Sequence, residues 1–254
     1  MKILFCGTSF EHASRLLQKH LPHDRIWCCS GSDIGDHIAE TEVAIPLMSR
    51  LDARLIERGN ELRLIQQFGV GLEGVDLEAA QRMGIEVANV PSEQTGNAVS
   101  VAEWVLLLML ALARDYPGQA KSIEHRRLGS PVGKTLYGKL AAIVGLGNLG
   151  MAIAERLKAL GMQVRGVRKR PELNTASSNA IDFFGGPRDL GRLLTSADFV
   201  ILTVALCAET RGLIGREELA RMKPSAFLVN VARGPVVSYD ALMWALENKE
   251  IAGA

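Results

Sequence analysis

Short apolar runs recur along the whole chain and are separated by amphipathic or polar stretches. The run 140–144, Leu-Ala-Ala-Ile-Val, has no polar alternation, which predicts a strand that is covered on both faces, as in a parallel sheet. Similar runs predict further strands at residues 2–6, 25–29, 43–48, 62–68, 85–89, 163–167, 197–203 and 226–234. Helices are expected between them, at residues 11–19, 54–58, 77–82 and around 217–219. This alternation of strands and helices predicts an α/β fold.

Three glycines in the pattern G-x-G-x-x-G follow the strand 140–144 directly. Gly145 permits a tight turn, Gly147 lets the backbone approach a pyrophosphate, and Gly150 lets the next helix pack closely on the strand. That helix carries apolar residues at helical spacing, namely Ile153, Leu157 and Leu160. The strand 163–167 completes a βαβ unit, in which the N-terminus of the helix would bind phosphate. The sequence therefore predicts a dinucleotide site here rather than a structural glycine turn.

A second glycine-rich loop follows the strand 62–68. It contains Gly69, Gly71 and Gly74. At the carboxyl end of a strand, such a loop frees backbone N–H groups to form an anion-binding concavity. Two interpretations are open at this point: a carboxylate-binding loop, and a plain turn, which is favoured if the loop is taken by itself.

The interval 91–97, Pro-Ser-Glu-Gln-Thr-Gly-Asn, is polar and rich in helix breakers, which predicts a domain boundary. Residues 98–114 after it predict a long, almost wholly apolar helix. Large apolar side chains form a stripe along it, at Trp104, Leu107, Leu108 and Ala111. Such a stripe belongs either to the core or to a subunit interface. Residues 115–139 are polar and basic, are interrupted at 129–131, and lead into the strand 140–144.

Composition narrows the class of protein. A length of 254 residues suits one large domain or two small ones, and a net charge of +1 gives no reason to expect binding to nucleic acid or to an anionic membrane. No apolar run reaches the roughly 18 residues of a membrane span, the longest being 104–113. The four cysteines, Cys6, Cys28, Cys29 and Cys207, have no metal-binding spacing, and adjacent Cys28 and Cys29 would point to opposite faces of a strand. We expect a cytoplasmic protein with reduced, buried thiols and without a metal.

Five motifs then occur in order along the chain. They are GVGLEGVD at 69–76, NAVSVAE at 97–103, GLGNLG at 145–150, ETRGLI at 209–214 and MKPSAFLVNVARG at 222–234. Together they resemble the D-isomer-specific 2-hydroxyacid dehydrogenases, the family of phosphoglycerate dehydrogenase, glyoxylate/hydroxypyruvate reductase and D-lactate dehydrogenase. The resemblance covers almost the whole chain. It implies a doubly wound Rossmann parallel sheet plus a smaller, flavodoxin-like α/β domain.

The resemblance also implies that the two domains have different functions. Residues 1–96 would form the substrate-binding domain. Residues 97–254 would form the dinucleotide-binding domain, including the linking and dimerisation helix 98–114. The expected assembly is a homodimer, with substrate in a cleft between the domains, where closure excludes water before hydride transfer.

The chemistry that the resemblance implies is hydride transfer between a nicotinamide and the C2 carbon of a small 2-oxo or 2-hydroxy acid. The backbone N–H groups of Val70 and Gly71 would hold the carboxylate. Arg233 would bridge the carboxylate and the carbonyl oxygen with its planar donor fork, and the alternative for Arg233 is an ordinary surface ion pair. The implied cofactor-binding residues are Gly145, Gly147, Asn148, Leu149, Gly150, Arg168, Lys169, Arg170, Val204, Ala205, Val231 and Ala232.

The chain departs from the pattern of NAD-using relatives after the strand 163–167. Those relatives carry an acidic residue there, which accepts the ribose 2′-hydroxyl. This chain has Arg168, followed by Lys169 and Arg170. Cations can pair with a 2′-phosphate, whereas a carboxylate would repel it. We therefore expect NADP(H) over NAD(H); the alternative is a solvated basic loop with lax specificity.

A second departure lies at the last residues. In the family, the strand after 251–254 carries an Asp for the nicotinamide amide, then a Glu, then the His that donates and accepts the proton. All three would lie beyond Ala254, so we expect the natural protein to be longer, and residues 1–254 alone could be inactive. The histidines of the chain all precede Arg233 and are interpreted as surface or packed residues: His12, His20, His23, His37 and His125.

Three functions remain open at this point. The first is a 2-hydroxyacid dehydrogenase that acts as an NADPH-dependent reductase of a glyoxylate-like or hydroxypyruvate-like substrate. The second is a formate or phosphite dehydrogenase, because the same anion loop and arginine can hold those ions. The third is a non-catalytic protein that senses a dinucleotide, since the family scaffold also occurs in corepressors.

Overall fold

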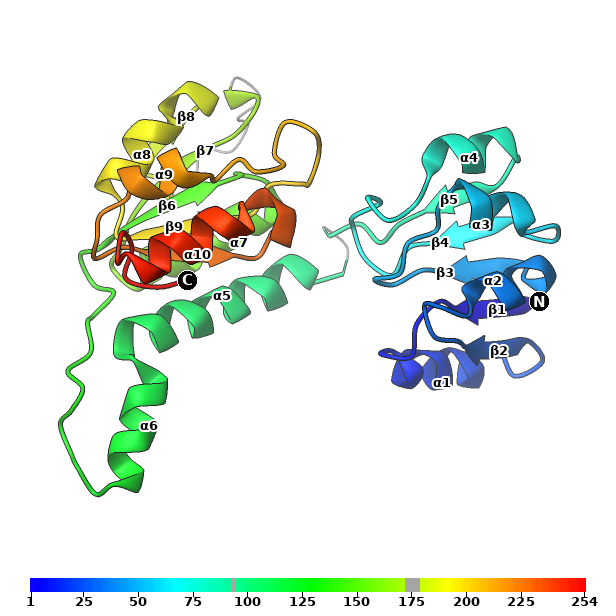
Figure 1. The fold of residues 1–254 in the computed structure, drawn as a ribbon, viewed down its shortest axis with the longest axis horizontal. Helices are drawn as coiled ribbons and strands as arrows, with labels where there is room; N and C mark the ends of the chain where they lie inside the picture. Colours follow the sequence, from blue (N-terminus) through cyan, green and yellow to red (C-terminus); the bar gives the residue numbers. More distant parts are fainter. Residues whose placement is uncertain (93–94, 172–178) are drawn as a thin grey trace. The chain divides into compact units, whose positions relative to one another are not determined.

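The chain folds into two compact units, Met1–Thr95 and Gly96–Ala254, which are described one at a time (Figure 1). The structure is a computed structural model and describes residues 1–92, 95–171 and 179–254. Positions 93 and 94 of the predicted boundary interval lie outside the described residues.

The first unit is built on a parallel sheet of five strands, in the order β2-β1-β3-β4-β5. This is the flavodoxin-like order, as predicted. The strands are β1 (Lys2–Phe5), β2 (Arg25–Cys28), β3 (Val43–Ile45), β4 (Leu64–Gln66) and β5 (Glu86–Ala88). The helices are α1 (Glu11–His20), α2 (Ile34–His37) with a 3-10 turn (Ile38–Glu40), α3 (Ala53–Arg58) and α4 (Leu77–Arg82). Helix α1 packs on one face of the sheet and α2, α3 and α4 pack on the other.

The second unit is built on another parallel sheet of five strands, in the order β10-β9-β6-β7-β8. The first strand in sequence, β6, lies in the middle and the chain winds outward from it in both directions, which is the doubly wound Rossmann arrangement. The strands are β6 (Leu140–Val144), β7 (Gln163–Val167), β8 (Phe183–Gly185), β9 (Phe199–Leu202) and β10 (Phe227–Asn230). The predicted fold class is therefore confirmed for both units.

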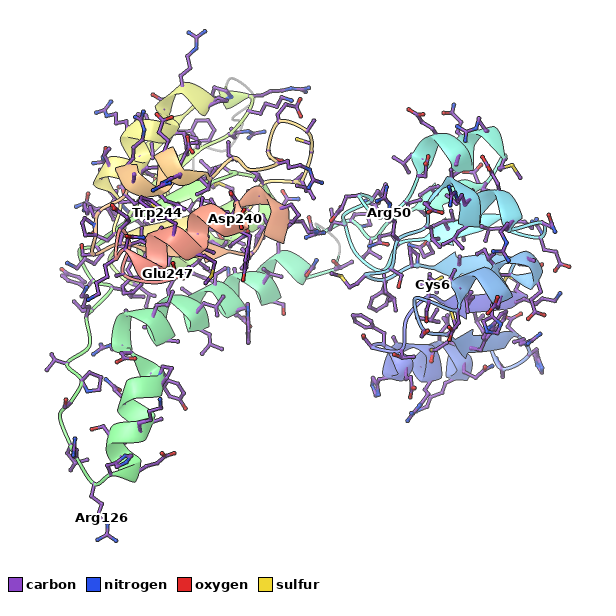
Figure 2. All side chains as sticks on the ribbon, viewed as in Figure 1. Cys6, Arg50, Arg126, Asp240, Trp244 and Glu247 are labelled. Atoms are coloured by element: carbon purple, nitrogen blue, oxygen red, sulfur yellow. The ribbon has the colours of Figure 1, made fainter. Side chains whose placement is uncertain are left out.

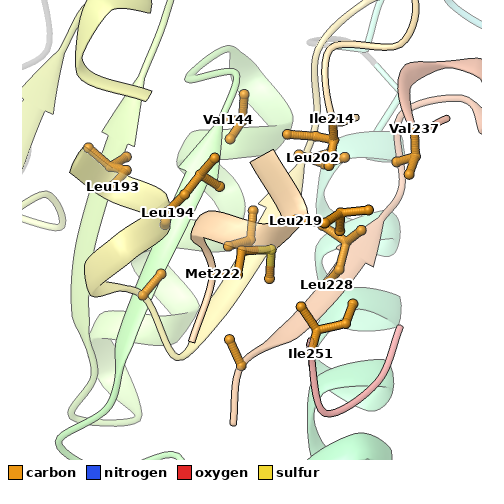
Figure 3. Packing of buried hydrophobic residues seen from close by; sticks show 14 of the residues in the cluster. Val144, Leu193, Leu194, Leu202, Ile214, Leu219, Met222, Leu228, Val237 and Ile251 are labelled. Carbon is orange, nitrogen blue, oxygen red and sulfur yellow. The ribbon is translucent and has the colours of Figure 1, made fainter. Parts of the chain in front are cut away.

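Helices cover both faces of the second sheet. Helices α5 (Asn97–Arg114) and α7 (Asn148–Ala159) pack on one face. On the other face pack α8 (Leu190–Ser196), α9 (Arg216–Arg221) and α10 (Tyr239–Glu247). Figure 3 shows leucines of α8 and α9 in the same cluster as strand residues: Leu193, Leu194 and Leu219 with Val144, Leu202 and Leu228. Figure 2 shows Asp240, Trp244 and Glu247 along α10, and the Arg216 guanidinium of α9 lies 3.9 Å from the centroid of the Trp244 ring.

Some elements of the second unit were not predicted. Helix α6 (Tyr116–Glu124) lies in the stretch that was described only as polar and basic. Its Pro117 lies in the first turn, where proline is favoured, and the Asp115 carboxylate caps that turn by accepting a hydrogen bond from Gly118 N. Strand β8 and helices α8 and α10 are short and were likewise missed. Leu160 was expected within the helix α7 with Ile153 and Leu157, but it directly follows the helix and is exposed.

Helix α5 buries one side and exposes the other. Ala102, Val105 and Met109 are fully buried against the sheet, whereas Trp104 and Leu107 are 57% and 53% exposed. Within the described ranges, α5 is the one helix that is long and apolar enough to cross a membrane by length and composition alone, with a mean hydropathy of 1.5 over 18 residues. The apolar run 104–113 is as short as the sequence analysis states, but it lies in a helix of 18 residues whose few polar residues leave the mean hydropathy high.

All four cysteines are free thiols. Cys28 and Cys29 point to opposite faces of the first sheet, as predicted from their adjacency in a strand. Burial raises the pKa of the Cys6 thiol to about 12 and that of Cys29 to about 11; Cys6 is labelled in Figure 2. Cys207 is exposed, so the expectation that all four thiols are buried was wrong for this residue. It lies in a loop after β9 rather than within a strand.

Candidate dinucleotide site and substrate loops

Four neighbouring strands of the second unit end in one row. Val144 of β6 pairs with Val167 of β7 and Leu202 of β9, and Leu202 pairs with Asn230 of β10. Because the strands are parallel, the loops that follow these four residues all leave the same edge of the sheet, where α/β proteins bind ligands. The predicted residues fall in these loops or in the first turn of α7: Gly145 and Gly147 in the turn after β6, Asn148, Leu149 and Gly150 at the start of α7, Arg168, Lys169 and Arg170 after β7, Val204 and Ala205 after β9, and Val231, Ala232 and Arg233 after β10.

The glycine turn after β6 has the local geometry of a phosphate cradle. Gly145 has φ +113°, and a Cβ there would lie 2.8 Å from Val204 N. A Cβ on Gly150 would lie 2.3 Å from Gly145 O, so only glycine allows α7 to pack this closely. A Cβ on Gly147 would meet nothing within 4 Å, and α7 begins there without a side-chain cap. The open space and the uncapped helix start fit a dinucleotide pyrophosphate.

Thr203 fixes the glycine turn from the neighbouring strand. Its hydroxyl lies 2.5 Å from Gly145 O, to which it donates, and 3.2 Å from Val144 O. Gly145 N donates to Val167 O at 2.9 Å on the other side. The turn is therefore held by both flanking strands. Sequence analysis did not single out Thr203, because its partner is 58 residues away and no local pattern marks such a contact.

Asn230 shapes the bend that carries Arg233. Its Oδ1 accepts a hydrogen bond from Ala232 N at 3.0 Å, and its Nδ2 donates to Arg233 O at 2.9 Å. The Arg233 guanidinium donates from Nη1 to Ala232 O at 2.8 Å, and the side chain is half-buried. The bend is thus preformed by its own polar groups at the end of β10.

The glycine-rich loop after β4 belongs to the first unit. Gly69 has φ +157°, and its carbonyl accepts a hydrogen bond from Val90 N at 2.9 Å. The next carbonyl, Val70 O, accepts a hydrogen bond from Asn89 Nδ2 at 2.8 Å. Val70 itself is exposed. Asn89, which sequence analysis placed only at the end of a strand, therefore holds the predicted carboxylate-binding backbone in shape.

The basic cluster after β7 is partly engaged. Arg168 N donates to Gly185 O at 3.1 Å, which continues the pairing of β7 with β8, and the Arg168 side chain is half-buried. Lys169 Nζ lies 3.1 Å from Glu209 Oε1, and Arg170 is exposed. The pKa of Glu209 is lowered to about 2 by hydrogen bonds from the Cys207 side chain and its own backbone N–H, and by Lys169.

An apolar cavity of about 760 Å³ lies elsewhere in the second unit, between α5, β10 and α10. Its lining includes Leu108, Leu112, Leu228, Val237 and Leu242. The glycine turn and the basic cluster do not line it, and its lining has polar side chains at Asn230 and Tyr239 but no charged side chain. The candidate dinucleotide site is therefore the edge formed by the four strand ends and not this cavity.

The comparison with protein families shows to which family this chain belongs. Residues 106–254 match the family model described as "D-isomer specific 2-hydroxyacid dehydrogenase, NAD binding domain". The chain belongs to the D-isomer specific 2-hydroxyacid dehydrogenase family. The resemblance seen in the sequence motifs is thereby confirmed, and the glycine turn lies within the part that matches the NAD-binding domain.

Relatives within the D-isomer specific 2-hydroxyacid dehydrogenase family differ in length and named activity. D-3-phosphoglycerate dehydrogenase of Synechocystis sp. is 36% identical over 230 residues, which are 89% of this chain and 40% of that protein. Glyoxylate reductase of Thermococcus onnurineus is 32% identical over 267 residues, covering 100% of this chain and 78% of that protein. The chain thus spans less than half the length of the first relative.

Solved structures in the same family share the fold of this chain. NAD-dependent formate dehydrogenase from Staphylococcus aureus, in complex with NAD, superimposes with a TM-score of 0.85 at 26% sequence identity. The match covers 100% of this chain and 80% of that one. The D-isomer specific 2-hydroxyacid dehydrogenase fold therefore accounts for both units, and a nicotinamide dinucleotide is the cofactor class that the family uses.

Proposed function

We propose that this protein reduces a small 2-oxo acid to a D-2-hydroxy acid and that NADPH is its preferred cofactor. One observation carries the proposal: the strand ends of β7, β6, β9 and β10 place the basic cluster, the glycine turn and the Arg233 bend along one edge of a sheet. Family membership supports the reaction class. Relatives named glyoxylate reductase favour a glyoxylate-like or hydroxypyruvate-like substrate.

The chain's own residues would bind and polarise the acid. The N–H groups of Val70 and Gly71 would bind its carboxylate, because the Gly69 conformation and the Asn89 hydrogen bond fix that backbone. Arg233 would bridge the carboxylate and the 2-oxo oxygen and stabilise the negative charge that develops on that oxygen. A bound nicotinamide would supply the hydride chemistry. Gly145, Gly147 and the start of α7 would hold the dinucleotide phosphates.

The preference for NADPH is proposed from charge. Residues 168–170 place three cations after β7, at the position where an acidic residue would accept the ribose 2′-hydroxyl. Guanidinium and ammonium groups pair well with a phosphate dianion. Arg168 is the residue that we propose to contact the 2′-phosphate, with Lys169 and Arg170 beside it.

We further propose that the protein is cytoplasmic and forms a homodimer, in which the two chains pair through α5.

A second candidate is oxidation of formate. It is favoured by the structural match to the formate dehydrogenase from Staphylococcus aureus. Formate offers the same anionic oxygens to the loop at Val70 and to Arg233 as a 2-oxo acid does. The two functions differ in the direction of hydride transfer and in the cofactor form consumed.

The test is a panel of small 2-oxo acids, assayed with NADPH and NADH on the protein as its gene encodes it, beside formate with NAD. We expect turnover of glyoxylate or hydroxypyruvate, with a kcat/KM that is higher for NADPH. Arg168→Asp should move the preference toward NADH by about tenfold, since the exchange replaces attraction to a phosphate by repulsion. Formate oxidation without 2-oxo acid reduction would favour the second candidate. Unchanged discrimination in Arg168→Asp would remove the basis for NADPH.

A further inference from the structure

The ion pair between Lys169 and Glu209 joins two loops that flank the glycine turn. Lys169 follows β7 and Glu209 lies in the loop after β9, with Nζ and Oε1 3.1 Å apart. In the sheet, β6 lies between β7 and β9. The pair therefore closes across the end of the strand that leads into the glycine turn, on the edge where the proposed dinucleotide would bind.

The loop after β9 holds Glu209 in a defined place. The Thr210 hydroxyl accepts a hydrogen bond from Cys207 N at 2.8 Å and donates to Ala205 O at 2.7 Å. Arg211 N donates to Cys207 O at 3.0 Å. Glu209 thus lies within a turn that is closed by backbone and hydroxyl groups. Its carboxylate stays charged throughout the neutral range, because its pKa is about 2.

Lys169 cannot serve this carboxylate and a phosphate equally well. Both side chains of the pair are well exposed, at 74% and 65%, and exposed pairs are weak, so an incoming ligand can displace one partner. A 2′-phosphate beside Arg168 would reach the same stretch of chain as Lys169 and would compete with Glu209. A ribose 2′-hydroxyl carries no charge and would leave the pair intact.

We propose that Glu209 is a specificity residue, which competes with the 2′-phosphate of NADP(H) for Lys169 and so limits the preference for NADP(H) over NAD(H). This inference rests on the proposed dinucleotide site. It predicts that the preference of the protein for NADP(H) over NAD(H) is smaller than the three cations at residues 168–170 would give without Glu209. Removing the Glu209 charge should therefore increase the preference for NADP(H) over NAD(H), and the protein should still bind both dinucleotides.

The test is equilibrium binding of two nucleotide fragments, 2′,5′-ADP and 5′-AMP, measured by calorimetry on Glu209→Gln and on the unchanged protein. We expect Glu209→Gln to bind 2′,5′-ADP about 2- to 5-fold more tightly, which is the size of one exposed ion pair, and to bind 5′-AMP with unchanged affinity. Glu57→Gln is the matched control, because Glu57 forms a similarly exposed pair with Arg82 at 3.2 Å in the other unit.

Two further variants make the result decisive. Lys169→Gln should weaken the binding of 2′,5′-ADP and leave the binding of 5′-AMP unchanged. In the double variant, adding Glu209→Gln to Lys169→Gln should not increase the affinity for 2′,5′-ADP. A gain of equal size in that double variant, or no gain in Glu209→Gln, would overturn competition for Lys169. If the unchanged protein binds neither fragment, the proposed dinucleotide site fails and this inference fails with it. Fragment binding with no effect of Glu209 would refute this inference alone.

Discussion

Single polar side chains at or just after the ends of strands hold in shape the two bends that are predicted to bind substrate. Asn89, after β5, donates to Val70 O, and Asn230, at the end of β10, bridges Ala232 N and Arg233 O. The glycine spacing of the loop at 69–74 and the motif at 222–234, which contains the second bend, could both be found in the sequence. The part played by Asn89 could not, because its hydrogen bond reaches 19 residues back along the chain and leaves no local pattern.

Replacing Asn89 by leucine, which has a similar size but no donor, should raise the KM for the 2-oxo acid about 5- to 10-fold and change kcat little. Losing one hydrogen bond costs about 1 kcal/mol, and here it would loosen a backbone proposed to bind the substrate carboxylate equally in the ground and transition states. Steady-state kinetics at saturating cofactor would measure the split. The KM for the cofactor should stay unchanged, and an unchanged KM for the acid would contradict the positioning role of Asn89.

At the scale of elements, sequence analysis predicted β6 and β7 most accurately. Strand β6 is an unbroken apolar run that ends at a glycine, and β7 follows it at the distance that a βαβ unit requires. Helix α6 and strand β8 were missed because breaker residues or short length hide them. The opposite edge of the second sheet is fixed by Asp198, which precedes β9. Its carboxylate accepts hydrogen bonds from Leu140 N at 2.9 Å and from Lys223 Nζ at 3.0 Å.

Asp198 should make the stability of the second unit depend on pH. Burial raises the pKa of its carboxyl, but the Leu140 N–H and the Lys223 ammonium outweigh burial and leave that pKa below its ordinary value. A carboxyl with a depressed folded-state pKa stabilises the fold above the unfolded-state pKa of about 3.9, and this contribution is lost as the pH falls through the folded-state pKa.

Asp198→Asn should therefore lower the free energy of unfolding by about 1 kcal/mol at pH 7, because the amide keeps an acceptor for Leu140 N and loses the charge facing Lys223. The deficit should shrink as the pH is lowered below about 4. Urea unfolding across that range would measure it. Glu86→Gln, at an exposed position of β5, is the control, and a deficit of constant size at all pH values would rule out the electrostatic account.

At the scale of the whole molecule, one side of the long apolar helix α5 is exposed in the single chain. Trp104, Leu107 and Leu110 are exposed on α5, and Tyr116 and Ile123 are exposed on the next helix, α6. Sequence analysis predicted that the stripe on this helix belongs either to the core or to a subunit interface. The structure places only part of α5 in the core, because the sheet can cover one side of a helix and no more.

Pairing of two chains through this side of α5 makes a definite prediction about mass. Residues 1–254 should travel at about twice 27.5 kDa in light scattering after gel filtration, and Leu107→Lys should travel as one chain, since burying an unpaired ammonium in an apolar interface costs several kcal/mol. Leu160→Lys is the matched control, because Leu160 is an exposed leucine at the end of α7 and its replacement should leave the measured mass unchanged.

If the unchanged chain is a monomer in buffer but sediments with lipid vesicles, the apolar side of α5 faces a membrane and the proposed dimer is wrong. If both lysine variants stay dimeric, the subunits meet through another surface.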